Sequence, residues 1–66
     1  MTRTQKKMAK FMLTYGDKGW QSFADDRETV ECVCALHNLG IVRVNEFQQM
    51  RLISREKACR FLGLPT

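Results

Sequence analysis

The hydrophobic period changes at Gly40 within residues 36–54 (LHNLGIVRVNEFQQMRLIS), and this change constrains the fold more than any other feature. Before Gly40 the apolar residues recur at helical spacing, whereas after it they alternate as in half-buried strands. We expect strands at 41–44 and 50–53, joined by the loop NEFQQ. Glycine at this boundary is typical of a helix that is ended by a residue in the left-handed conformation.

The alternation also predicts how the two strands pair. The preferred register puts four apolar side chains on one face through the pairs Val42–Leu52 and Val44–Met50. Arg43 then lies opposite Arg51 on the other face. A two-residue turn would instead put Gln49 on the apolar face, so we prefer the longer loop.

A first helix is predicted with Thr4 as its N-cap and Gly16 at its end. The spacing i, i+3, i+4, i+7 predicts an apolar face formed by Met8, Phe11, Met12 and Tyr15. At 100° per residue, the opposite side is a basic stripe of Arg3, Lys6, Lys7, Lys10 and Thr14.

Residues 17–26 form a connector that holds at most one short turn or strand. We expect Trp20 and Phe23 to cover the edge of the core; the alternative is an exposed stacking platform for bases. Asp25 followed by Glu28 predicts a capping box at the start of a second helix, which runs to the glycine stop. Its outward residues are Arg27, Glu28, Glu31, Ala35 and Asn38.

A last helix is predicted after Ser54, which can act as its N-cap. Its inward residues are Ala58, Phe61 and Leu62, and Gly63 with Pro65 ends it. The elements together predict a small α+β fold with the order helix, helix, strand, strand, helix.

The chain of 66 residues, 44% of them hydrophobic, has room for one domain spanning 1–66 with a small core. A core of this size favours a homodimer. Three cysteines do not complete a disulfide framework, which indicates a reduced, cytoplasmic setting. No apolar run reaches the ~20 residues of a membrane span, and the N-terminus lacks the apolar region of a signal peptide.

The net charge of +4 is unevenly distributed along the chain. Residues 1–18 hold five basic residues against one acidic residue, and residues 48–66 hold four against one. The middle holds five acidic residues against two basic ones. If the ends meet in space they form one basic patch, which favours a polyanionic partner; the alternative is ordinary solvated surface.

The stretch ALHNLGIVRVNEFQQMRLIS resembles the recognition helix and wing of the winged helix-turn-helix family, with the usual second helix reduced or absent. The match is carried by Leu36, Leu39, Gly40, Ile41 and Val42. The resemblance implies that 27–39 is the recognition helix and 43–51 the wing, with double-stranded DNA as the partner. The small size favours an origin in a phage or other mobile element.

The acidic outward face of the second helix repels phosphates, which leaves two functional interpretations open. In the first, the wing and the basic first helix bind DNA with little sequence readout, as in a transcription-regulatory accessory protein. In the second, the domain is an interaction module that binds a protein through the acidic helix and the wing. The expected nucleic-acid-binding residues are Lys6, Lys7, Lys10, Arg27, Arg43, Gln48, Gln49, Arg51 and Arg55.

The segment LISREKACRFLGLPT also resembles the opening helix of an excisionase-type helix-turn-helix. In that class a recognition helix follows this segment, and none follows within the 66 residues. This interpretation therefore requires a longer chain.

The sequence predicts neither an enzyme nor a cofactor. It has one histidine and lacks a glycine-rich phosphate loop and a nucleophile motif, so no set of residues for an active site can be identified. The residue types that can ligate zinc are Cys32, Cys34, His37 and Cys59. Cys32 and Cys34 are 200° apart on a helix and cannot both face one ion. We expect buried thiols and a histidine at the core edge, with no metal.

Overall fold

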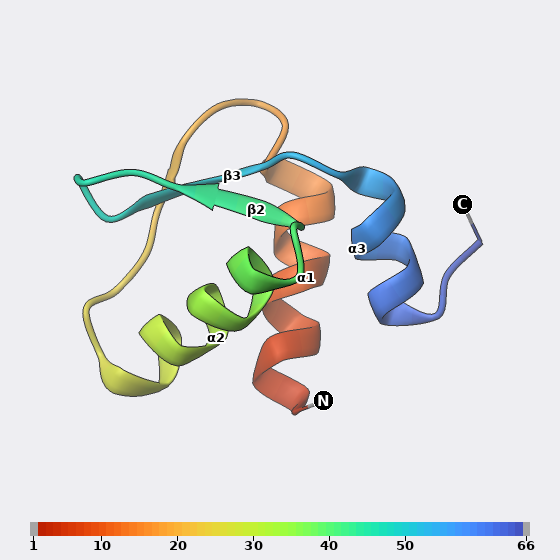
Figure 1. The fold of residues 1–66 in the computed structure, drawn as a ribbon, viewed down its shortest axis with the longest axis horizontal. Coiled ribbons are helices and arrows are strands. Elements are labelled where there is room, and N and C mark those ends of the chain that lie inside the picture. Colours follow the sequence, from red (N-terminus) through yellow and green to blue (C-terminus); the bar gives the residue numbers. More distant parts are fainter. Residues whose placement is uncertain (1, 66) are drawn as a thin grey trace.

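The computed structural model describes residues 2–65 as an α+β fold of three helices and a three-stranded antiparallel sheet (Figure 1). The elements in chain order are α1 (Arg3–Tyr15), β1 (Gln21–Ser22), α2 (Arg27–Asn38), β2 (Val42–Val44), β3 (Gln49–Leu52) and α3 (Arg55–Leu62). The predicted fold class and element order are confirmed. The short strand within the connector is β1, and the sheet order is β1-β3-β2.

The hairpin of β2 and β3 has the predicted register, with Arg43 opposite Arg51. Val42, Met50 and Leu52 are buried on its inner face, and Val44 packs against the core from the same face. The predicted loop was one residue too long, because Gln49 belongs to β3 and pairs with Ser22 of β1. Pairing on both sides of β3 extends its ladder toward the loop.

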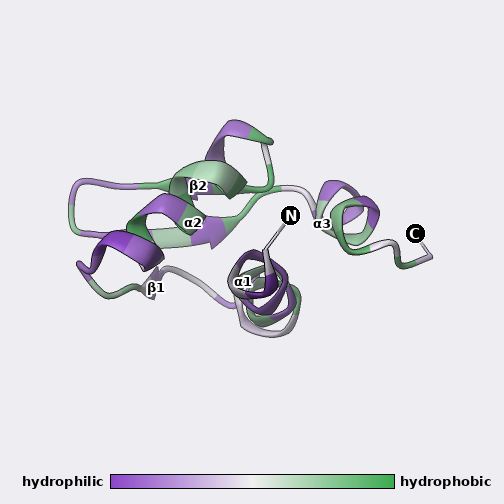
Figure 2. Ribbon diagram, turned by 90° about the horizontal axis from the view of Figure 1, so that it is seen from below, coloured by the Kyte–Doolittle hydropathy of each residue, from purple (hydrophilic) through white to green (hydrophobic). Residues whose placement is uncertain are grey.

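The core lies between the sheet and the helices. α1 and α2 lie on the same side of the sheet (Figure 1), and α1 lies between α2 and α3 (Figure 2). The fully buried side chains with the largest volume are Met12, Leu36, Ile41, Val33 and Val42. Burial of these apolar groups is the main stabilising contribution, at about 25 cal/mol per Å².

Gly16 positions α1 against the sheet. A Cβ at this residue would lie 2.9 Å from Cβ of Leu52, so a larger side chain would force the helix away from β3. The Gly16 carbonyl oxygen accepts a hydrogen bond from the Leu52 amide at 3.1 Å. The C-terminal end of α1 is therefore bound to β3, while its N-terminal end points away from the sheet (Figure 1).

The apolar face predicted for α1 was wrong in part. The helix buries Ala9 and Met12, whereas Phe11 and Tyr15 are 41% and 46% exposed. Small Ala9 allows a close approach that a larger side chain would prevent, so the buried arc is centred on the Ala9 side of the helix. The N-cap was also misplaced: Thr2, not Thr4, accepts from the Gln5 amide and forms a capping box with Gln5.

The start of α2 differs from the predicted capping box by one residue. Asp26, not Asp25, is the N-cap, and its carboxylate accepts from the amide and the hydroxyl of Thr29 at 2.8 Å each. Glu28 instead accepts from the Thr4 hydroxyl. The helical residues end at Asn38, and Gly40 has the expected left-handed conformation with φ of 77°.

Three side chains are more exposed than predicted. Trp20 is 39% exposed, although Phe23 packs against the core as expected. Cys32 is buried but Cys34 is exposed, since their positions on α2 point in nearly opposite directions. His37 is also exposed. The α3 prediction is confirmed, with Ser54 as N-cap and Gly63 as a left-handed C-cap.

Candidate nucleic-acid interface

The outer face of the hairpin carries Arg43 and Arg51, which the strand register places directly opposite each other. Both residues are exposed, because the alternation of β2 and β3 turns their neighbours Val42 and Leu52 inward. Among residues 2–65, no acidic side chain forms an ion pair with either arginine. Like charges at directly opposed positions destabilise a sheet, so their juxtaposition has a structural cost.

The loop that follows β2 is ordered by Asn45. Its Oδ1 accepts hydrogen bonds from the amides of Phe47 and Gln49 at 2.9 and 3.1 Å, and its Nδ2 donates to Oε1 of Gln49 at 2.9 Å. Gln48 adopts a left-handed conformation with φ of 54°, which closes the four-residue connection at 45–48. The loop is therefore a defined turn.

Phe47 occupies the tip of this turn and is 73% exposed, the largest exposure among the large hydrophobic residues of the described chain. Its amide is held by Asn45, so the ring is projected from a fixed backbone. Gln48 is exposed beside it. Gln49 is half-buried and bonded to Asn45, so its side chain helps to build the turn.

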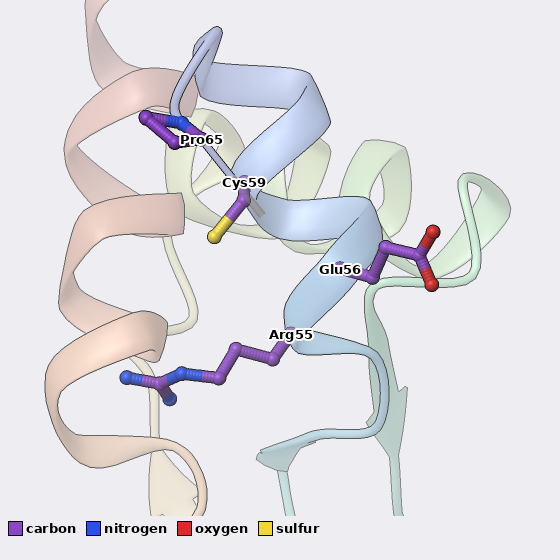
Figure 3. A pocket seen from close by; sticks show the side chains of 4 residues that line it. All are labelled: Arg55, Glu56, Cys59 and Pro65. Carbon is purple, nitrogen blue, oxygen red and sulfur yellow. The ribbon is translucent and has the colours of Figure 1, made fainter.

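Arg55 has a structural role that the sequence did not predict. Its Nη1 donates to the Leu13 carbonyl oxygen at 3.1 Å and lies 3.6 Å from Oδ2 of Asp17. Figure 3 shows the side chain extending from α3 toward α1, along a groove lined by Arg55, Glu56, Cys59 and Pro65. Arg55 therefore joins the end of α1 to the start of α3, with part of its charge balanced by Asp17.

The lysines of the basic stripe are exposed as predicted, and none of Lys6, Lys7 and Lys10 forms an ion pair within residues 2–65. Lys6 and Lys7 belong to the end of α1 that points away from the sheet (Figure 1). At 1.5 Å rise per residue, about 15 Å of helix separates Lys6 from the Gly16 contact with β3. The structure thus divides the expected interface into two surfaces, the hairpin and the outward face of α1.

The basic ends of the chain do lie side by side, because α1 packs against α3. The basic residues of α3 are largely occupied, however: Arg55 binds Asp17 and Arg60 binds Glu56. Most of the uncompensated positive charge on this side belongs to α1. Within residues 2–65, the basic patch expected from the charge distribution is reduced to the lysines of α1 and to Lys57 of α3.

Arg27 lies among acidic residues at the start of α2 and is not a separate positive charge. Its Nε lies 3.1 Å from Oε1 of Glu31, and Glu28 lies on the same helical turn. Hydrogen bonds from the Thr29 amide and hydroxyl hold the pKa of Asp26 below its ordinary value, so the cap stays ionised. Phosphates are repelled from this end of α2.

A groove between α2 and the hairpin has an apolar floor and a polar rim. Its apolar lining is Phe23, Val30, Val33 and Val44, and its rim is Asp25, Cys34, His37 and Gln48. Sequence reasoning missed this groove because its walls come from three separate segments. It also missed the ordering role of Asn45, although asparagine before a turn is a recognised signal for side-chain bonding to the backbone.

Comparison with known proteins adds no identification. No family model, curated protein or solved structure matches the chain. A search of residues 2–65 found no helix with the length and apolar character needed to cross a membrane.

Proposed function

We propose that this protein is a winged-helix-type accessory protein that binds the backbone of double-stranded DNA, with the hairpin as its leading contact. The observation that carries the proposal is that Arg43 and Arg51 are exposed on opposed strands and form no ion pair within residues 2–65. Arginine presents a planar fork of donors that matches phosphate oxygens. An anion bound between the two arginines would offset the repulsion by which they destabilise the sheet.

The turn adds contacts that a phosphate site alone would not need. Phe47 projects from a fixed backbone, and apolar side chains of this kind can insert at a groove. Gln48 can donate and accept hydrogen bonds at a base edge. The lysines of α1 add sequence-independent attraction to phosphates. We therefore expect an affinity that falls steeply as the salt concentration rises and that depends little on the DNA sequence.

The test is duplex binding measured at several salt concentrations with the double variant Arg43→Gln and Arg51→Gln. Each lost phosphate contact should reduce the slope of log affinity against log salt by about 0.9, so the double variant should lose about 1.8. Arg27→Gln is the matched control, since this exposed arginine is already paired with Glu31. Equal loss in both variants would place α2 at the interface instead, and no loss in either would reject the hairpin contact.

A protein-interaction module is the second candidate, favoured by the groove between α2 and the hairpin. Its apolar floor, with Asp25 on the rim and Glu31 exposed on α2, fits a partner segment that carries apolar and basic side chains. Val30→Lys should abolish such a complex and leave duplex binding unchanged. A protein partner that survives Val30→Lys but is lost with Arg43→Gln would move the contact from this groove to the hairpin, and no protein partner at all would reject this candidate.

A further inference from the structure

We infer that the outward face of α1 is a separate binding site for single-stranded nucleic acid, in which Phe11 and Tyr15 stack on unpaired bases and lysines bind the phosphates. The site lies apart from the hairpin. It therefore stands whether or not the hairpin binds duplex DNA.

The first observation is an aromatic pair on the exposed side of the helix. The ring centroids of Phe11 and Tyr15 are 5.1 Å apart, with an angle of 48° between the ring planes. The rings are 41% and 46% exposed, because α1 buries the side that holds Ala9 and Met12. Two neighbouring aromatic rings at a surface give bases a place to stack.

The second observation is the charge around these rings. Lys7 precedes Phe11 by one helical turn, and Nζ of Lys18 lies 5.7 Å from the centroid of the Tyr15 ring. Within residues 2–65, neither of these lysines forms an ion pair. The combination of unpaired lysines with exposed rings is complementary to an anionic ligand that carries flat apolar groups.

The acidic residues near this surface are already engaged. Asp17 binds Arg55, and Glu28 at the edge of the site accepts a hydrogen bond from the Thr4 hydroxyl. They weaken the positive potential at its margins but do not neutralise Lys7 or Lys18. The charge on the face itself remains positive.

The geometry favours single strands over a duplex. In a duplex, bases stack on one another and offer only their edges, whereas an unpaired base offers its face to an aromatic ring. Sequence-tolerant stacking supplies affinity that phosphate contacts alone would not give. The face should therefore distinguish a strand with bases from one without them.

The experiment measures fluorescence anisotropy with a labelled oligothymidylate and with an abasic strand of the same length and charge. The test variant is the double change Phe11→Leu and Tyr15→Leu, which keeps apolar side chains on the helix but removes the rings. Stacking values imply at least about a tenfold loss of affinity for oligothymidylate and no change for the abasic strand. Leu39→Ala, at the exposed apolar C-cap residue of α2, is the control and should leave both affinities unchanged.

A second variant keeps the test independent of any folding effect of the leucines. Lys7→Gln with Lys18→Gln should flatten the salt dependence for both strands, with helicity confirmed by circular dichroism. The inference is overturned if oligothymidylate and the abasic strand bind equally, or if the leucine variant binds like the wild type. It is also overturned if vesicles rich in phosphatidylserine bind this face and oligothymidylate does not. The double variant Arg43→Gln and Arg51→Gln should keep the difference in affinity between oligothymidylate and the abasic strand, whereas the leucine variant should lose it, which separates this site from the hairpin.

Discussion

Arg43 and Arg51 lie directly opposite each other on neighbouring strands, and neither has an acidic partner within residues 2–65. The adjacent cross-strand pairs, Val42–Leu52 and Val44–Met50, are apolar and face inward. The hairpin therefore combines a favourable inner face with an electrostatically unfavourable outer one. The inner face therefore stabilises the fold, whereas the outer face is free to be changed in tests of binding.

The first prediction follows from that separation. Arg43→Glu places a carboxylate opposite Arg51, so the free energy of unfolding should rise by about 0.2–1 kcal/mol while duplex binding falls. Urea denaturation and anisotropy titration measure the two effects. Arg43→Gln should show a smaller gain in stability. A glutamate variant that is less stable than the wild type would mean that the arginines do not repel each other in the folded chain.

The second prediction concerns the turn. Asn45→Ala removes the acceptor for the Phe47 and Gln49 amides, so it should lower the free energy of unfolding by about 1 kcal/mol and speed hydrogen exchange at both amides. Asn45→Asp is the matched control, because it keeps the acceptor oxygen and loses only the donor to Gln49. If both variants exchange at the wild-type rate, the turn is ordered by other contacts.

The third prediction concerns the lysines of α1. Replacing Lys6, Lys7 and Lys10 with glutamine should weaken duplex binding to a similar extent for all sequences and flatten its salt dependence, because phosphate contacts carry no sequence information. Competition binding with unrelated duplexes measures both effects. Unchanged binding by the folded triple variant would remove α1 from the duplex interface and leave the hairpin as the sole contact.

The fourth prediction concerns the thiols. Burial, together with Glu28 and Glu31, raises the pKa of Cys32, and its side chain is only 5% exposed. Exposed Cys34 should therefore be alkylated by iodoacetamide well before Cys32 in the native protein. Mass spectrometry of peptides after a time course gives the order. Equal rates at the two residues would show that α2 opens readily.

The fifth prediction concerns acid stability. The pKa of Asp26 is lowered in the folded chain by hydrogen bonds from Thr29, so at low pH the unfolded state binds the proton more readily. Its contribution is present above the ordinary value of 3.8 and is lost as pH falls through the lowered folded value. Melting temperatures of the wild type and Asp26→Asn should therefore differ most near neutral pH and converge in acid. A constant difference across this range would contradict the titration of Asp26.

The sequence alone was sufficient for features that depend on local periodicity. The hairpin register follows from a side-chain period of two, because a slip of one residue would expose Val42 and Val44 and bury Arg43. Gly40 and Gly63 mark helix ends because their left-handed conformations suit glycine. These choices are made by neighbours along the chain, so the fold class and the opposition of the two arginines could be predicted.

The tertiary structure alone decided which side of α1 is buried and which charges remain unpaired. The spacing of Phe11 and Tyr15 fits a helical face, but the close packing of Ala9 and Met12 turns the aromatic rings outward. Arg55 is as basic in sequence as Arg51, yet only the approach of α1 and α3 brings it to Asp17. Packing and ion pairing depend on distances between segments remote in the chain, which no local pattern records.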